Sequence, residues 1–223
     1  MVKNDYLFFG HCFQLGLAKG PLLEIGSMAI ERQGGNICQE ARKLAISPTF
    51  GVDIAPGPGV DHVADFSVPT DSFRWEFDKF ATAVVFNVLE HTFDPITILR
   101  NVIRCVQPHG TILLVVPTVW PLHDFPKDYC RLMPHWFEEF ATRHGLTVVP
   151  EAFCWLSAFG IVPIGELREG EQYELPSFLN LGQSQPFQYW RSRAVHRIFN
   201  TFGRSHWFAH CAIGAALRIP DAK

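Results

Sequence analysis

Runs of apolar residues without polar alternation limit the fold of this chain more than any other feature of its sequence. Residues 82–88 and 111–116 are the clearest runs, because they are rich in β-branched and aliphatic side chains. Strands that lack polar alternation are covered on both faces, as in parallel sheets. Weaker runs bordered by turn residues cover 21–25, 50–54, 62–66, 146–149 and 210–219.

Two segments between these runs have helical patterns. Residues 96–106 carry apolar side chains at helical spacing, Asp94 is a good N-cap, and Pro95 fits the first helical position. Residues 134–144 have one apolar face, and Gly145 is a stop signal. Alternating strands and helices predict an open α/β sheet, in which ligands bind at the carboxyl ends of the strands.

Size and composition restrict the class of protein. A chain of 223 residues, 48% of them hydrophobic, is expected to form a single domain over residues 1–223. The net charge of -3 and the lack of a long basic run argue against nucleic acid as a partner. Six dispersed cysteines suggest reduced thiols in a cytoplasmic protein. No stretch reaches the ~20 apolar residues of a membrane span, and no signal peptide is recognisable.

Two residues at the predicted strand ends point to an adenosine-containing cofactor. Gly26 lets the chain approach a ligand closely, and Asp53, at the tip of the second strand, can accept hydrogen bonds from a ribose diol. The turn after Gly26 lacks the later glycines that a pyrophosphate needs, and it includes Glu31. S-adenosylmethionine (SAM) has a cationic centre and no phosphate. The missing glycines and the added carboxylate would therefore weaken its binding little.

Five short motifs follow one another along the predicted sheet. They are Leu22-Leu23-Glu24-Ile25-Gly26-Ser27, Gly51-Val52-Asp53, Ala64-Asp65-Phe66, Phe86-Asn87-Val88-Leu89-Glu90-His91 and Asp94-Pro95. Their order and spacing resemble those of class I SAM-dependent methyltransferases of the small-molecule, type 11-like group, over residues 21 to about 154 and the final strand. The resemblance implies a Rossmann-like sheet of seven strands, mostly parallel with the last antiparallel, and helices on both faces. One departure is the first loop, where the usual G-x-G is Gly26-Ser27-Met28.

The resemblance also implies a set of cofactor residues. In that family the first acidic residue and glycine border the methionine part of SAM, the second-strand Asp binds the ribose, and the third-strand Asp meets the adenine amino group. S-adenosylhomocysteine is the product. The implied cofactor residues are Glu24, Gly26, Ser27, Asp53, Ile54, Asp65, Phe66 and Asn87.

Each of these polar residues also has a purely structural interpretation. Glu24 could accept hydrogen bonds from a nearby backbone N–H, Asp65 could cap a helix, and Asn87 could form a turn. Their coincidence at matching strand ends favours the cofactor site.

Methyl transfer from a sulfonium requires chiefly that donor and acceptor are held in line without water. A hydroxyl or amine acceptor also needs a group to take its proton. The segment 121–131 resembles a P-x-H-x-x-P-x-D-Y-x-R stretch of many bacterial methyltransferases of this type. The predicted base is His123, with His91 as second choice, and Asp128, Tyr129 and Arg131 are orienting or structural groups. Alternatively, His91 could make a structural hydrogen bond within its loop, and Asp128 and Arg131 could form a salt bridge that holds the segment to the body of the protein.

Residues 155–208 are expected to form an insertion between the last two strands. Their apolar residues and arginines suit a lid, a wall of the acceptor pocket, a homodimer surface or a helix over the sheet edge. His206, His210 and Cys211 lack a nearby third ligand, so no metal site is predicted.

Three functions compete. The first is SAM-dependent methylation of a small-molecule, lipid or glycan acceptor, with O-methylation ahead of N-methylation. The second is a non-catalytic, methyltransferase-like binding or regulatory module, which the irregular Gly26 loop keeps open. The third is a nicotinamide-dependent reductase, against which the missing glycines argue.

Overall fold

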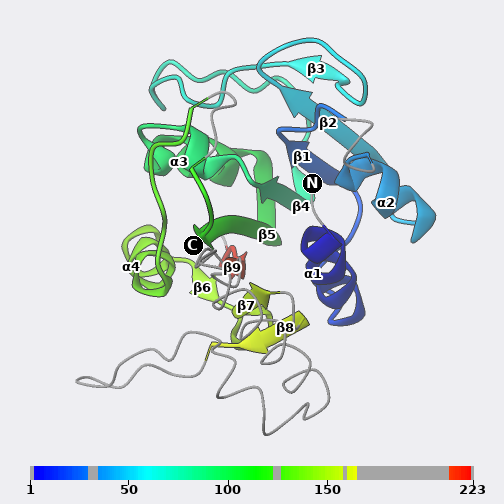
Figure 1. The fold of residues 1–223 in the computed structure, drawn as a ribbon. Coiled ribbons are helices and arrows are strands. Elements are labelled where there is room, and N and C mark those ends of the chain that lie inside the picture. Colours follow the sequence, from blue (N-terminus) through cyan, green and yellow to red (C-terminus); the bar gives the residue numbers. More distant parts are fainter. Residues whose placement is uncertain (1–2, 30–34, 123–126, 158–159, 165–210, 222–223) are drawn as a thin grey trace, which may run out of the picture.

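The computed structural model describes residues 3–29, 35–122, 127–157, 160–164 and 211–221. Within them the chain forms one sheet, with helices on both faces (Figure 1). The strands lie in the order β3-β2-β1-β4-β5-β9-β7-β8, and β6 pairs with β9.

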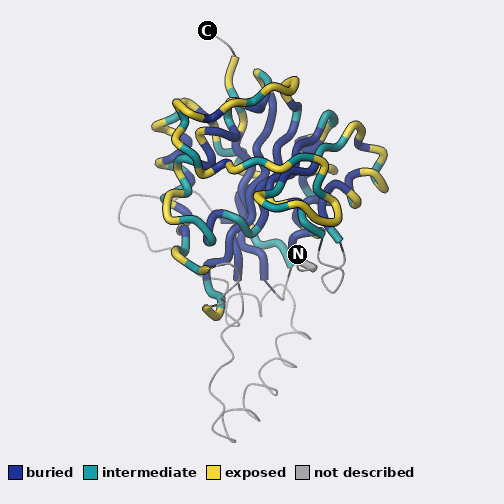
Figure 2. The backbone as a smooth tube through the Cα atoms, turned by 90° about the horizontal axis from the view of Figure 1, so that it is seen from above, coloured by how far each residue is buried: buried dark blue, intermediate teal, exposed yellow. Residues whose placement is uncertain are grey.

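The first half of the sheet is parallel. It consists of β1 (Leu22–Ile25), β2 (Thr49–Asp53), β3 (His62–Val63), β4 (Phe80–Phe86) and β5 (Val106–Val119). Most of the central strands β1, β4 and β5 is buried, as the lack of polar alternation in their sequences predicts (Figure 2).

The second half of the sheet is antiparallel and larger than predicted. The last strand, β9 (Cys211–Arg218), lies between β5 and β7 (Cys154–Ser157) and also pairs with β6 (Thr147–Val148). The described residues hold nine strands rather than seven, because the start of the expected insertion forms β7 and β8 (Gly160–Pro163). The Rossmann-like class with an antiparallel last strand is confirmed.

Four α-helices are described, and they cover the two faces of the sheet in pairs. They are α1 (Lys3–Gln14), α2 (Ile37–Lys43), α3 (Pro95–Cys105) and α4 (Pro134–His144). Apolar residues of α3 and α4 belong to one buried cluster and those of α1 and α2 to another (Figure 1). Two short 3-10 helices, η2 (Leu89–His91) and η3 (Pro150–Ala152), complete the set.

The predicted helix signals of α3 and α4 are confirmed. Asp94 accepts hydrogen bonds from the N–H groups of Ile96 and Thr97, each at 3.1 Å. Gly145 ends α4 in the left-handed region, with φ of 66°.

Helix α1 was not predicted from the sequence. Its sequence shows no clear helical period, although Phe8, Phe9 and Cys12 are fully buried against the sheet. Gly10 in its middle and the lack of a capping signal hide the helical pattern.

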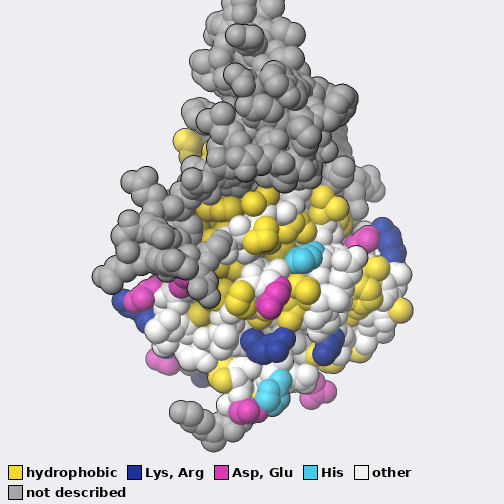
Figure 3. All heavy atoms as spheres, turned by 90° about the horizontal axis from the view of Figure 1, so that it is seen from below, with side chains coloured by type: hydrophobic (Ala, Val, Ile, Leu, Met, Phe, Trp, Pro, Cys, Tyr) yellow, Lys and Arg dark blue, Asp and Glu magenta, His cyan; other side chains and the backbone are white. Residues whose placement is uncertain are grey.

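The sheet ends at β8, whose residues are partly exposed. Hydrophobic side chains gather on this lower face of the molecule (Figure 3). Within the described ranges, no helix is long and apolar enough to cross a membrane.

Candidate functional site

The carboxyl ends of β1, β2 and β4 meet at one edge of the sheet. Ile25 lies in register with Val52 of β2 and Val85 of β4, so the residues that follow these strands are neighbours. Gly26 N–H donates to the Val52 carbonyl at 2.8 Å. The structure thus brings together the predicted positions Gly26, Asp53 and Asn87.

Gly26 is required by both conformation and space. Its φ is +77°, which L side chains rarely adopt. A Cβ at this position would lie 2.5 Å from Cγ2 of Val88 in the β4 connection. The β1 turn therefore passes close to the residues that follow β4.

Asp53 closes the β1 turn onto β2. One carboxylate oxygen accepts a hydrogen bond from Met28 N–H at 3.0 Å, and the other accepts one from Ile54 N–H at 2.8 Å. Each oxygen keeps a second lone-pair direction, so the carboxylate can still accept from a diol. Ile54 itself is 67% exposed beside it.

Glu24 has a structural role in this structure. Its buried carboxylate accepts hydrogen bonds from Ile37 N–H at 2.8 Å and Cys38 N–H at 2.7 Å, in the first turn of α2. Asn36 accepts from Gln39 N–H, so together they satisfy three of the four free donors of that turn. Burial raises the pKa of Glu24 to about 7, against the effect of the two backbone donors.

Ser27 is fully buried, and its hydroxyl has no hydrogen-bond partner among the described residues. It lies against the β2 backbone, because a Cβ placed on Gly51 would be 2.7 Å from Ser27 Oγ. The Ser27 carbonyl accepts from the Asn36 side chain at 2.7 Å. An unsatisfied hydroxyl next to the β1 turn is a group that a ligand could engage.

The third-strand residues divide into an exposed and a buried one. Asp65 is exposed, and one of its oxygens accepts from the N–H and hydroxyl of Ser67. Phe66 is 2% exposed and packs against Phe73 and Trp75, so only its backbone can face a ligand.

Asn87 follows β4 with a left-handed φ of 53°. Its side-chain nitrogen donates to Asp5 of α1 at 2.9 Å. Asp5 is fully buried, and sequence reasoning missed it because α1 itself was missed.

The connection after β4 is bound to the segment that follows β5 by three contacts. The Tyr129 N–H donates to the Glu90 carbonyl at 2.7 Å, and the Cys130 thiol donates to the Leu89 carbonyl at 3.5 Å. His91 Nδ1 lies 2.7 Å from the Lys127 carbonyl. These contacts hold η2 and residues 127–131 as one unit.

Glu90 is a buried carboxyl within this unit. It is 1% exposed, and neither of its oxygens has a hydrogen-bond partner among the described residues. Burial raises its pKa to about 8, with Asp128 and Asp5 adding to the rise and Arg131 opposing it. His91 Nε2 lies 3.7 Å from Glu90 Oε1.

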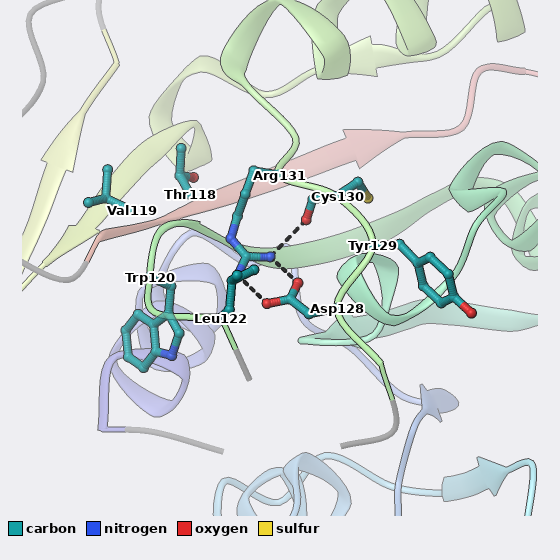
Figure 4. A pocket seen from close by; sticks show the side chains of 8 residues that line it. All are labelled: Thr118, Val119, Trp120, Leu122, Asp128, Tyr129, Cys130 and Arg131. Carbon is teal, nitrogen blue, oxygen red and sulfur yellow. Dashed lines mark hydrogen bonds and ion pairs between the residues drawn. The ribbon is translucent and has the colours of Figure 1, made fainter. Parts of the chain in front are cut away.

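A cavity of about 440 Å³ opens between the end of β5 and residues 128–131 (Figure 4). Asp128 and Arg131 form the predicted ion pair on its wall, through both carboxylate oxygens. The lining residues are Thr118, Val119, Trp120, Leu122, Asp128, Tyr129, Cys130 and Arg131.

The sequence also indicates Tyr129 and His123 as candidate residues of this region. Tyr129 is half exposed and lies edge-on to Phe93, at 6.2 Å between ring centroids. His123, the predicted base, lies outside the described residues, as do His206, His210 and most of the predicted insertion.

A family model described as a methyltransferase domain matches residues 12–207. The chain belongs to this methyltransferase family. No curated protein matches the chain in sequence. Among solved structures, the methyltransferase is similar to a Bacillus halodurans protein assigned the same activity, with a TM-score of 0.53 and 10% identity. That match covers 96% of this chain and 99% of the other.

Two other solved structures share the fold of the methyltransferase. The plantazolicin methyltransferase BpumL, in complex with a pentazolic desmethylPZN analogue and S-adenosylhomocysteine, matches with a TM-score of 0.53 and 13% identity. The match covers 97% of this chain and 84% of that one. The 4+2 cyclase SpnF matches with a TM-score of 0.53 and 15% identity, over 98% and 82% of the chains. At these identities the likeness is one of fold.

The described residues of the methyltransferase fit the SAM that its family implies. The β1 turn has a glycine where a Cβ would collide, an unsatisfied buried hydroxyl at Ser27, and the Asp53 carboxylate at the neighbouring strand end. Both carboxylate oxygens of Glu24 accept hydrogen bonds from backbone N–H groups of α2. A contact between Glu24 and SAM would therefore compete with these hydrogen bonds. Sequence reasoning missed Thr118, because a threonine inside an apolar strand gives no signal.

Proposed function

We propose that this methyltransferase transfers the methyl group of SAM to an oxygen of a small-molecule, lipid or glycan acceptor, with His91 as the base. The observation that carries the proposal is the position of the His91 ring between Lys127 and Glu90. Bound SAM supplies an electrophilic methyl group, and S-adenosylhomocysteine is released.

The cofactor side of the proposal rests on three strand ends. Gly26 would allow close approach of the methionine part, Asp53 would accept from the ribose, and Asn87 would line the pocket after β4. Their convergence at the carboxyl edge of parallel strands supports this assignment.

The hydrogen bonding of His91 supports its role as a base. A carbonyl oxygen only accepts hydrogen bonds, so the nitrogen that faces Lys127 must carry the proton. In the neutral ring Nε2 therefore holds a lone pair and can take a proton from an acceptor hydroxyl.

Glu90 supports the same step from the other side of the ring. A proton taken by Nε2 arrives 3.7 Å from the Glu90 carboxyl. The positive charge of the imidazolium would lower the pKa of Glu90 from its raised value of about 8, so above that lowered pKa the Glu90 carboxylate would stabilise the charged ring.

The experiment is calorimetric titration of the full chain with SAM, S-adenosylhomocysteine and, as a control, NADH. We expect micromolar binding of the two adenosyl ligands and none of NADH. Methyl transfer is then followed with isotope-labelled SAM against hydroxylated acceptors and their amine analogues. Binding without transfer to any acceptor would favour a non-catalytic module, and binding of NADH alone would favour a reductase.

A further inference from the structure

The wall of the cavity beside β5 carries donor groups that no described residue uses. Thr118 is 9% exposed, and its hydroxyl has no hydrogen-bond partner in the described part of the chain. The register between β5 and β9 shifts between Pro117 and Val119, so Thr118 is the extra residue of a β-bulge. Bulges near sites redirect a side chain, and Thr118 is one of the residues that line the cavity, although its unpaired hydroxyl oxygen is itself buried.

Arg131 offers a second set of unused donors. One terminal nitrogen, Nη1, donates to Asp128 and to the Cys130 carbonyl at 2.9 Å, and Nη2 donates to the other oxygen of Asp128. Nε–H and the second N–H of Nη2 lie together on the remaining edge of the guanidinium. The described residues provide no acceptor for that edge. In Figure 4 Asp128 lies on one side of the Arg131 guanidinium, and Thr118, Val119 and Trp120 lie on the other side.

A guanidinium edge with two parallel N–H groups matches a carboxylate, whose two oxygens accept both. Asp128 already shares the charge of Arg131, which favours a ligand with one negative charge over a phosphate dianion. The other walls include Val119, Trp120 and Leu122, and the volume of about 440 Å³ suits a small organic molecule.

We infer that this cavity binds the acceptor through a carboxylate, which is held by the open edge of Arg131 and by the hydroxyl of Thr118, with an apolar or aromatic body against Trp120. The inference rests on the proposed function and names its substrate class. Contacts from residues 129 and 130 to η2 place this cavity beside Glu90 and His91.

The test measures binding of phenylacetate, 4-hydroxybenzoate and octanoate to the full chain, with and without S-adenosylhomocysteine. Phenylacetamide and phenyl phosphate are the matched probes. We expect at least one carboxylate to bind, and phenylacetamide to bind about tenfold or more weakly than phenylacetate.

Two pairs of variants locate the site. Thr118→Val should weaken carboxylate binding about fivefold, while Thr118→Ser should restore it, because only the hydroxyl differs in function. Arg131→Lys keeps the charge but loses the two-donor edge, so it should weaken binding about tenfold. The control is Arg143→Lys on the exposed side of α4, which should change nothing.

The inference is overturned if no carboxylate binds, if phenylacetamide binds as well as phenylacetate, or if Thr118→Val and Arg131→Lys both bind like the wild type. Tighter binding of phenyl phosphate would overturn it in favour of a phosphorylated acceptor. Affinity for S-adenosylhomocysteine is measured separately on each variant and should not change. If the wild-type chain does not bind S-adenosylhomocysteine, the proposed function is contradicted. The carboxylate measurements made without S-adenosylhomocysteine then still test the inference on their own.

Discussion

The Asn87 side chain at the carboxyl end of β4 donates to Asp5 of α1, with 2.9 Å between Nδ2 and Oδ2. This hydrogen bond joins the first helix of the chain to the strand end at the centre of the candidate cofactor site. Helix α1 therefore does more than cover one face of the sheet, because it fixes a residue next to the proposed ligand.

Two substitutions at Asn87 separate its hydrogen bond from its backbone conformation. Asn87→Gly removes the bond to Asp5 but tolerates the φ of 53°, whereas Asn87→Ala also strains the backbone. We expect both to weaken S-adenosylhomocysteine binding in calorimetry. Asn87→Ala should also lower the free energy of unfolding by about 1 kcal/mol more than Asn87→Gly. Equal stability of the two variants would contradict this account.

Asp53 should contribute to cofactor affinity through its charge. A charged hydrogen bond to a ribose hydroxyl stabilises a complex by about 1.5–3 kcal/mol, so Asp53→Ala should weaken SAM binding about ten- to a hundredfold. Exposed Asp78 provides the control, since Asp78→Ala removes one surface charge away from the strand ends. Unchanged SAM affinity in Asp53→Ala would remove Asp53 from the site.

Glu90 should make the stability of the folded chain depend on pH. Its pKa is raised to about 8 in the folded state, so between about pH 4.5 and 8 the folded chain holds a proton that the unfolded chain has lost. The contribution of Glu90 to the free energy of unfolding then falls by about 1 kcal/mol per pH unit as pH rises through that window.

The side chain of Glu90→Gln cannot ionise. In urea unfolding, the free energy of unfolding of this variant should therefore rise relative to that of the wild type from pH 6 to pH 8. Glu76→Gln, an exposed substitution, controls for the loss of one negative charge. A constant difference between Glu90→Gln and the wild type across this range would mean that Glu90 is ionised in the fold.

His91 should affect turnover without affecting the cofactor. Removal of a general base typically costs 10²–10⁴-fold in rate, so His91→Gln should lower kcat by about that factor on a hydroxyl acceptor. Binding of S-adenosylhomocysteine, measured by calorimetry, should stay the same. His123→Ala is the paired variant, and a larger loss of kcat there than in His91→Gln would assign the base to His123.

The sequence predicted those parts of the fold in which local signals and packing agree. Asp94 and Gly145 carry unambiguous helix boundary chemistry, and α3 and α4 lie where those residues predict. Helices α1 and α2 and strands β7 and β8 were missed. The residues of α1, β7 and β8 are apolar without a clear period, α2 is only seven residues long, and the places of all four depend on partners distant in sequence.

The sequence also predicted only part of the candidate site, namely the residues that follow the parallel strands. Strand-end residues such as Gly26 and Asp53 are identified by their order along the chain, and the parallel register then brings them together. Contacts that cross the fold, such as Glu24 with the first turn of α2 or Thr118 at a bulge, depend on geometry that no local pattern records.

The position of β9 has a consequence for synthesis on the ribosome. β7 is complete at Ser157, but the strand on which it pairs begins only at Cys211, about 50 residues later. At typical translation rates that interval lasts several seconds. During it, β6 and β7 have no β9 to pair with, and the apolar edge of β5 stays uncovered. The nascent methyltransferase should therefore bind chaperones most strongly between these two points of elongation.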